Sequence, residues 1–150
     1  MSSYVNSDDT SLVVSGGDDG GLAFLLAHTT GPDVPSAAQG LYASSSVLVN
    51  RAHGSAVTAC AILGLQSHTY VLTSGNDEWV RLWEVVINDA RDVGTSPHSF
   101  NRLTIRRLSK VKTSVADVSS MAVLDDGDDT ARVLLCGIGM EVIRLESSPE

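Results

Sequence analysis

Short runs of apolar residues, or of alternating apolar and polar residues, recur along the chain with turn-forming residues between them. The separators include GGDDGG, GND and DDGDD, whose glycine and aspartate content is typical of tight turns. No stretch of a dozen residues follows the helical period of about 3.6, so the pattern predicts an all-β protein. The expected strands are residues 11–15, 22–27, 41–49, 57–65, 69–74, 79–87, 103–108, 118–124, 133–136 and 140–145.

The expected strands repeat in sets. Residues 15–19 (SGGDD) align with residues 73–77 (TSGND) at an offset of 58 residues, since 77 − 19 = 58. Each of the first two sets also contains a polar stretch of 13 residues, at 28–40 and at 88–100. Removing one such stretch from the offset leaves 45 residues (58 − 13), which matches repeats of roughly 40–45 residues with four strands per unit.

The second set carries a specific series of polar and aromatic positions. Ala52-His53 comes before its first strand, the TSGND turn occupies 73–77, and the third strand contains Trp83-Glu84. This series resembles a WD repeat, whose pattern is a Gly-His pair, an apolar strand, a Ser-Gly-x-x-Asp turn and a Trp-Asp end. Ala52 in place of glycine and Glu84 in place of aspartate depart from that pattern. The resemblance implies one four-stranded blade of a β-propeller.

Four polar groups of this blade form a candidate structural tetrad, namely His53, Thr73, Asp77 and Trp83. A buried indole N–H needs an acceptor, which Thr73 can supply, and His53 can bridge Thr73 and Asp77. Leaving any one of the four groups unpaired would cost roughly 1–3 kcal/mol. A catalytic relay of His53, Asp77 and Thr73 is disfavoured, because Trp83 would plug it and the chain lacks nucleophile-elbow and oxyanion signatures. We therefore expect no catalytic residues and no enzyme activity.

The resemblance defines the expected organisation of the chain as a partial WD40 β-propeller of about two and a half blades. Blade 11–50 lacks its first strand, blade 55–108 is complete, and the last blade, 117–146, lacks its fourth strand. Residues 1–10 are expected to be a disordered N-terminus, with loop insertions at 28–40 and 88–100. Because closed propellers have about four to eight blades, we expect a C-terminal fragment whose remaining blades come from the full-length chain.

The order of motifs along most of the chain is similar to the C-terminal end of one WD-repeat family. The segments are LVVSGGDDGGL, RAHGSAVTACAIL, VLTSGNDEWVRLW, KTSVADVSSMAVL and LLCGIGMEVIRL. Members of that family are non-catalytic partners of a tRNA ribose 2′-O-methyltransferase that acts at the wobble position of the anticodon loop. The resemblance implies a scaffold that presents tRNA to a Rossmann-fold partner. S-adenosylmethionine would belong to that enzyme, so no cofactor is expected on this chain. The alternative is a generic WD40 adaptor for protein–protein interactions, as in ubiquitin ligation or trafficking.

Composition and charge restrict the compartment and the partners. The net charge of −8 and the pI of about 4.8 do not favour nucleic-acid or membrane binding by bulk electrostatics. Cys60 and Cys136 lie in apolar runs outside any Cys/His cluster, which is typical of buried, reduced thiols in a cytosolic or nuclear protein, and we expect a cytoplasmic one. The MSSYVNSDDT terminus has no basic and apolar pattern of a signal peptide, and no apolar run is long enough to span a membrane.

One charge cluster stands out against the acidic background. Five of the ten basic residues fall within positions 102 to 112: Arg102, Arg106, Arg107, Lys110 and Lys112. On the outermost strand of a blade these charges can protect the strand edge from pairing, or they can contact RNA phosphate or an acidic partner. Trp79, just after the TSGND turn, is a further candidate contact, since an exposed tryptophan is a typical interface anchor. The alternative for Trp79 is packing beneath the insertion at 28–40.

Two acidic stretches invite a metal or phosphate interpretation, and both are better explained as turns. DDGDD at 125–129 lacks the alternating ligand spacing and the distal glutamate of a calcium loop. GGDDGG at 16–21 is not followed by Lys-Ser/Thr or by a helix, unlike a phosphate-binding loop. We therefore expect β-turns at both places and no metal site.

Overall fold

The computed structural model describes residues 2–6, 10–29, 41–65, 68–88, 102–126 and 130–146. All regular secondary structure in these ranges is β-strand, so the all-β prediction is confirmed. The strands are β1 (Ser2–Asn6), β2 (Thr10–Gly16), β3 (Leu22–Thr29), β4 (Leu41–Val49), β5 (Val57–Leu65), β6 (His68–Gly75), β7 (Trp79–Ile87), β8 (Leu103–Lys112), β9 (Ala116–Asp126) and β10 (Thr130–Glu146).

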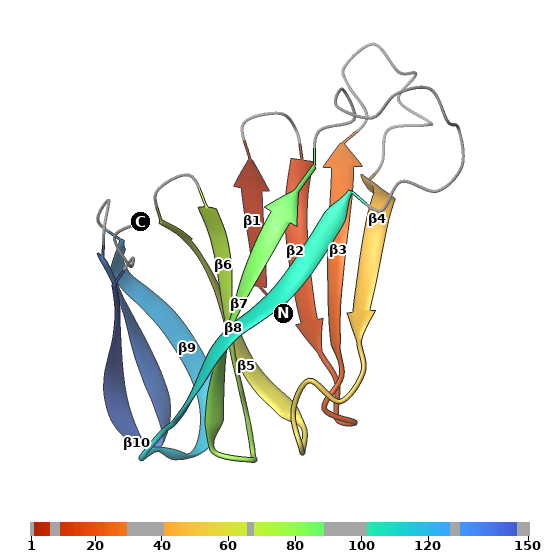
Figure 1. Cartoon of the computed structure of the whole chain (residues 1–150). Helices are drawn as coiled ribbons and strands as arrows, with labels where there is room; N and C mark the ends of the chain where they lie inside the picture. The colour runs from red at the N-terminus through yellow and green to blue at the C-terminus, as the bar shows by residue number, and fades with distance from the viewer. Residues whose placement is uncertain are drawn as a thin grey trace.

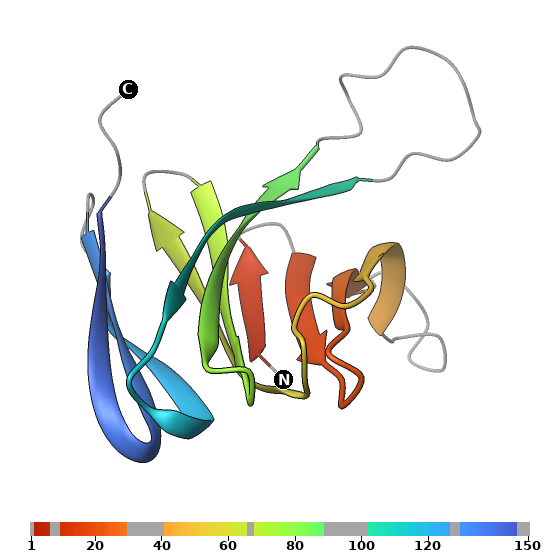
Figure 2. The same cartoon turned by 60° about the horizontal axis from the view of Figure 1, so that its bottom comes forward.

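The strands form three antiparallel sheets that stand side by side (Figure 1). The first sheet has the order β1-β2-β3-β4, the second β5-β6-β7-β8, and the third pairs β9 with β10. Figure 2 shows the same row from another direction, with the second sheet between the other two. Each sheet is a meander of consecutive strands, as short turns between neighbouring antiparallel strands favour.

Two apolar clusters hold the row together. Between the first and second sheets, Phe24 meets Trp83 edge to face, with ring centroids 6.3 Å apart and planes at 62°. Between the second and third sheets, Leu63 and Leu72 belong to one buried cluster with Val133. Because the second sheet is covered on both faces, consecutive residues of β6 from Val71 onward are all buried.

The GGDDGG turn between β2 and β3 has the geometry that its glycines allow. Gly17 N–H donates to the carbonyl of Gly21 at 3.0 Å, and Gly20 has a φ of 77°. Glu78, 58 positions later (78 − 20), occupies the corresponding place before β7 and also has a positive φ, of 60°. The aligned motifs therefore form turns with the same left-handed position, although only one of them has glycine there.

Strand β10 combines two of the expected strands, 133–136 and 140–145. It runs over 17 residues and doubles back on itself in both views (Figures 1 and 2). Gly139, near its middle, has a φ of 116°, a conformation that glycine adopts without the steric penalty of a side chain. Ile143 and Leu145, in its second half, pack against the cluster between the second and third sheets. The expected third strand of the last set is thus present as the returning half of β10.

Two expectations about the start of the chain are wrong. Ser2–Asn6 and Thr10 lie in strands, although residues 1–10 were expected to be disordered, and the first unit does have a first strand. Ser2–Asn6 form β1, which pairs antiparallel with β2 in a register that places Tyr4 opposite Leu12. Backbone pairing at a sheet edge needs no continuous apolar pattern, so the polar sequence SSYVN concealed this strand.

The other expected boundaries agree with the strands, apart from small extensions. His28 and Thr29, expected at the start of an insertion, end β3, and β8 continues to Lys112. The remainder of the two insertions, at 30–40 and 89–100, and the turn at 127–129 lie outside the described residues.

Candidate functional site

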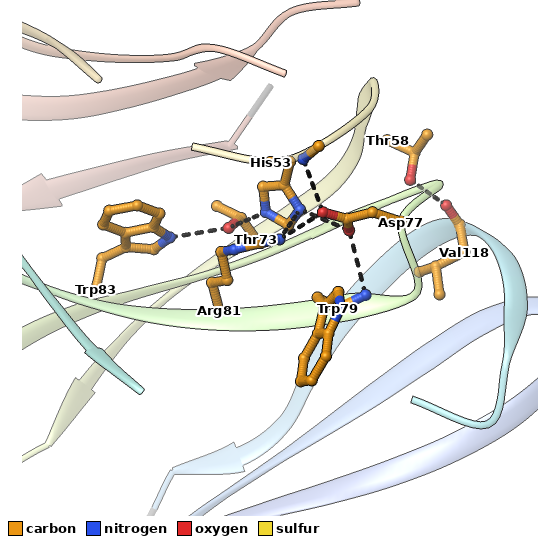
Figure 3. Close-up of polar contacts among 9 residues, drawn as sticks. His53, Thr58, Thr73, Asp77, Trp79, Arg81, Trp83 and Val118 are labelled. Atoms are coloured by element: carbon orange, nitrogen blue, oxygen red, sulfur yellow. Dashed lines mark hydrogen bonds and ion pairs between the residues drawn. The ribbon is translucent and has the colours of Figure 1, made fainter. Parts of the chain in front are cut away.

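The four residues of the candidate tetrad lie together on the second sheet (Figure 3). Thr73 is on β6 and Trp83 on β7, Asp77 is in the turn that joins these strands, and His53 is in the loop before β5. Thr73 and His53 are 0% and 2% exposed. The hairpin and the preceding loop therefore bring residues 30 positions apart (83 − 53) into one buried cluster.

The tetrad is a continuous chain of hydrogen bonds. Trp83 Nε1 donates to Thr73 Oγ1 at 2.9 Å, His53 Nε2 lies 2.8 Å from that same oxygen, and His53 Nδ1 lies 3.0 Å from Asp77 Oδ1. An ionised carboxylate only accepts, so we assign the imidazole proton to Nδ1, which donates to Asp77. His53 Nε2 then accepts from the Thr73 hydroxyl, whose oxygen in turn accepts from the indole.

Asp77 also binds the backbone of two separate segments. Its Oδ2 accepts from the N–H of Gly54 at 2.9 Å, and its Oδ1 accepts from the N–H of Trp79 at 3.2 Å. One carboxylate therefore fixes the loop before β5 and closes the turn before β7.

Arg81 is a fifth member that the sequence analysis missed. Its Nη1 donates to Asp77 Oδ2 at 2.9 Å and also contacts His53 Nδ1. The residue is only 8% exposed, and it pairs directly across the ladder with Thr73. The signal was available, because Arg81 is two positions before Trp83 and strand side chains alternate, so both must point to the same face.

Burial and charge fix the protonation states of the cluster. Burial lowers the pKa of His53 from its ordinary value of 6.5, and the neighbouring Arg81 cation lowers it further, against the opposing effect of Asp77. For Asp77, burial alone would raise the pKa. Hydrogen bonds from His53, Gly54, Arg81 and Trp79 outweigh that effect and hold the pKa well below its usual range. The cluster thus contains a neutral imidazole, a carboxylate and a guanidinium.

This arrangement binds strands together, and it offers no accessible reacting atom among the described residues. The Thr73 hydroxyl is fully buried and engaged by two partners, and the Trp83 ring that donates to it is 4% exposed. A substrate would have to displace the indole from the cluster between the first two sheets to reach this oxygen. The hydroxyl of Thr58, on β5, donates to the carbonyl of Val118, on β9, and so connects the second sheet to the third (Figure 3).

A second junction of the same kind connects the third sheet to the loop before β9. Glu141 Oε2 accepts from Thr113 Oγ1 at 2.6 Å, from the N–H of Ser114 at 2.9 Å and from Ser114 Oγ at 3.1 Å. The Thr113 hydroxyl and the Ser114 amide lower the pKa of Glu141. The sequence analysis missed this junction, because β10 must double back before Glu141 can reach residues 28 positions earlier (141 − 113).

The basic cluster lies mainly on β8, the outermost strand of the second sheet. Arg106 forms an ion pair with Glu84 at 2.8 Å, and Lys112 forms one with Glu78 at 3.1 Å. Lys110 Nζ lies 4.4 Å from the centroid of the Trp79 ring, which is half-buried beneath it. Arg107, opposite Trp83 in the ladder, is exposed. Four of the five predicted basic residues and Trp79 therefore share one edge of the molecule.

Arg102 is separate from the other four basic residues. Its Nη1 lies 3.1 Å from His28 Nε2, and His28 Nδ1 lies 3.0 Å from Thr10 Oγ1. This contact links the segment just before β8 to the first sheet, so Arg102 has a partner within the fold.

No family model matches the chain, and no curated protein or solved structure matches it. Within the part of the chain that the structure describes, no helix has the length and apolarity needed to cross a membrane. The fold and the site define an all-β protein of three antiparallel sheets with a buried polar cluster on the second sheet.

Proposed function

We propose that the chain is a non-catalytic scaffold made of WD40-type propeller blades. The observation that carries the proposal is the buried cluster of His53, Thr73, Asp77 and Trp83, in which each polar group satisfies another. Such a cluster stabilises a sheet, and it leaves the exposed edges and faces as the parts available for partners. The meander order of the first two four-stranded sheets supports the same interpretation.

The specific version of the proposal is a regulatory subunit for 2′-O-ribose methylation in the tRNA anticodon loop. It is supported by the order of motifs along the sequence and by the basic edge formed by Arg106, Arg107, Lys110 and Lys112 on β8. The side chains of Arg106 and Lys112 are 68% and 63% exposed, so their cations are accessible to phosphate oxygens despite their ion pairs. In this proposal the chain works in the cytoplasm, and the partner methyltransferase supplies S-adenosylmethionine and the chemistry.

Recovery of the protein from cells with its bound molecules tests the proposal. A tagged full-length protein is expected to co-purify with tRNA and with an S-adenosylmethionine-dependent methyltransferase, identified by RNA sequencing and mass spectrometry. Cells that lack the protein should lose ribose methylation at the wobble position. Recovery of other proteins with neither tRNA nor a methyltransferase would favour the generic adaptor.

A matched pair of variants tests the role of the basic edge. Arg107→Glu should reduce the recovered tRNA severalfold, because an exposed phosphate-binding cation becomes repulsive. Arg144→Glu is the control, since Arg144 is 64% exposed on β10 and lies outside the basic edge. Equal loss of tRNA in both variants would show that overall charge, and not this edge, governs binding.

A further inference from the structure

Ser109 lies within the basic edge and has an exposed hydroxyl. It belongs to β8, the last strand in the order β5-β6-β7-β8, so among the described strands only β7 pairs with it. All residues from Arg106 to Lys112 are exposed. No described residue makes a hydrogen bond to the Ser109 hydroxyl, whereas the hydroxyl of Ser114 donates to Glu141 at 3.1 Å. The Ser109 oxygen is therefore accessible to an enzyme-bound reagent.

A β-bulge interrupts the pairing of β8 next to this serine. Trp83 lies opposite Arg107, and its preceding neighbour on β7 lies opposite Ser109. Leu108 is thus an extra residue without a partner in the ladder. A strand that is paired on one edge only and interrupted by a bulge opens locally at a lower free-energy cost than a central strand. This part of β8 is therefore suited to leave the ladder and enter the groove of an enzyme as an extended segment.

Two consecutive arginines precede this serine. Arg106 and Arg107 are three and two positions before Ser109, and the side chain of Arg106 is 68% exposed. A guanidinium is a planar fork of N–H groups that binds a carboxylate through two hydrogen bonds. Protein kinases select their substrates partly by charge pattern, and a kinase with carboxylates in its substrate groove selects a serine that follows arginines. The order Arg-Arg-Leu-Ser in an exposed, extended segment is therefore typical of a substrate of such a kinase.

We propose that Ser109 is a phosphorylation site for a kinase with an acidic substrate groove, and that the added phosphate weakens RNA binding by the basic edge. ATP is the phosphoryl donor. The Ser109 Oγ forms a bond to the γ-phosphorus while the bond from that phosphorus to the β,γ-bridging oxygen breaks. ADP leaves, and the hydroxyl proton passes to a base of the kinase. The modification itself does not depend on RNA, whereas its effect on RNA binding rests on the proposed function.

The strand register brings the new phosphate close to one of the two arginines. Arg106 lies opposite Glu84 and Ser109 lies opposite Leu82. Because Glu84 and Leu82 are two positions apart on β7, Arg106 and Ser109 share one face of the sheet. A phosphoserine carries a charge of about −1.5 to −2, so it competes with Glu84 for the guanidinium that now pairs with that carboxylate at 2.8 Å. The basic edge then loses an accessible cation and gains a charge that repels RNA phosphate.

Phosphorylation of the purified full-length protein tests the site. The protein is incubated with magnesium ATP and the catalytic subunit of cyclic-AMP-dependent protein kinase, a probe for paired arginines before serine, and mass spectrometry locates the phosphate. We expect phosphate on Ser109 and none in Ser109→Ala. Ser120 is an internal control, because it is exposed on β9 but follows Asp117-Val118-Ser119, which contains no basic residue. A protein that takes up no phosphate, or takes it up at Ser114 or Ser120 in place of Ser109, would overturn the proposal.

A matched pair of arginine variants tests recognition by the arginines. Arg106→Gln and Arg144→Gln each remove an exposed, ion-paired arginine, since the two side chains are 68% and 64% exposed. Only Arg106 lies in the segment before Ser109, so the rate of phosphate uptake at Ser109 should fall severalfold in Arg106→Gln and stay unchanged in Arg144→Gln. Far-ultraviolet circular dichroism establishes that both variants are folded. Equal rates in the two variants would contradict recognition through the paired arginines.

The effect on RNA is measured by comparing the phosphorylated and unmodified protein for bound tRNA. Phosphorylation should reduce the retained tRNA severalfold, and treatment with a phosphatase should restore it. Equal retention by the two forms would overturn the effect of the phosphate on RNA binding. If neither form retains tRNA, the proposed function fails, and phosphate on Ser109 in the mass spectrum still establishes the modification site.

Discussion

Asp77 and Glu141 hold the loop before their sheet in two different ways. Each carboxylate accepts from a backbone N–H of that loop at 2.9 Å, from Gly54 in the second sheet and from Ser114 in the third. Asp77 then continues through His53 into a buried chain that ends at an indole. Glu141 instead binds two hydroxyl groups, from Thr113 and from Ser114, near the surface.

The comparison shows that a carboxylate bound to a loop N–H, which we call the backbone anchor, can occur with or without the buried polar cluster. Gly139 stands 62 positions after Asp77 (139 − 77), and its missing side chain leaves that place empty, with nothing within 4 Å of a Cβ. Glu141, two residues later, has the longer side chain needed to reach the loop. The third sheet therefore keeps the anchor without the aromatic residue, the imidazole and the buried arginine that accompany it in the second sheet.

The largest effect is expected from Asp77→Ala. The substitution leaves the Arg81 guanidinium buried without its carboxylate, which costs about 3–5 kcal/mol when a buried pair is broken. The free energy of unfolding from urea titration measures this loss. Glu78→Ala, one residue further along, removes only an exposed ion pair with Lys112 and should cost less than about 0.5 kcal/mol. Similar losses in the two variants would contradict the central role of Asp77.

Thr73→Val tests the chain of hydrogen bonds at almost constant shape. It leaves the indole N–H of Trp83 and Nε2 of His53 without their shared partner, at an expected cost of about 2 kcal/mol. Thr69→Val, on the same strand, is the control and should be nearly neutral. The same urea titration applies, and a neutral Thr73→Val variant would mean that the two groups find other partners.

The dependence of stability on pH distinguishes the imidazole of the second sheet from the carboxylates. Because the pKa of His53 is lowered in the folded chain, the unfolded chain binds the proton first as the pH falls below 6.5. Stability is therefore complete above that pH and declines below it, at no more than about 1.4 kcal/mol per pH unit for one proton. The lowered pKa of Asp77 adds a loss of the same sign only below its ordinary value of 3.8.

Unfolding measured between pH 7 and pH 5 in wild type and in His53→Gln checks this assignment. The free energy of unfolding should fall between pH 7 and pH 5 in wild type and should fall less steeply in the variant, whatever the loss of stability at pH 7. An identical slope in both proteins would assign the proton uptake to another group.

The smallest effect is expected from Glu141→Gln. The amide keeps an acceptor oxygen for the N–H of Ser114 but loses the charge, so the cost should be about 1 kcal/mol or less. Glu146→Gln is the control, because the side chain of Glu146 is 67% exposed and its ion pair with Arg144 is on the surface. A loss at Glu141 as large as that of Asp77→Ala would contradict the separation of anchor and buried cluster.

The periodic positions of the chain were sufficient to predict most of the fold. Strands such as β5 and β7 carry strong apolar patterns because they are buried between sheets, and the aligned turns at 15–19 and 73–77 divided them correctly. Strand β1 escaped prediction because its pairing with β2 depends on backbone groups that every sequence provides.

The part of the candidate site that could be predicted is the part formed by residues close together in the sequence. Thr73, Asp77 and Trp83 lie on one hairpin, and His53 is close behind its neighbouring strand, so their meeting follows from antiparallel pairing. Arg81 was missed because a charged residue in a strand is ordinarily assigned to the solvent face. Glu141 was missed because its contact depends on the return of β10, which is a tertiary feature.

The two tryptophans give the molecule two optical reporters with different exposure. Trp83 is sealed between sheets beside Phe24, whereas Trp79 lies half-buried beneath the ammonium of Lys110. An anionic quencher such as iodide will be attracted to Trp79 and excluded from Trp83, so the emission that remains comes from Trp83 and reports on the contact between the first and second sheets. Separation of these two sheets can thus be followed in real time without any added label.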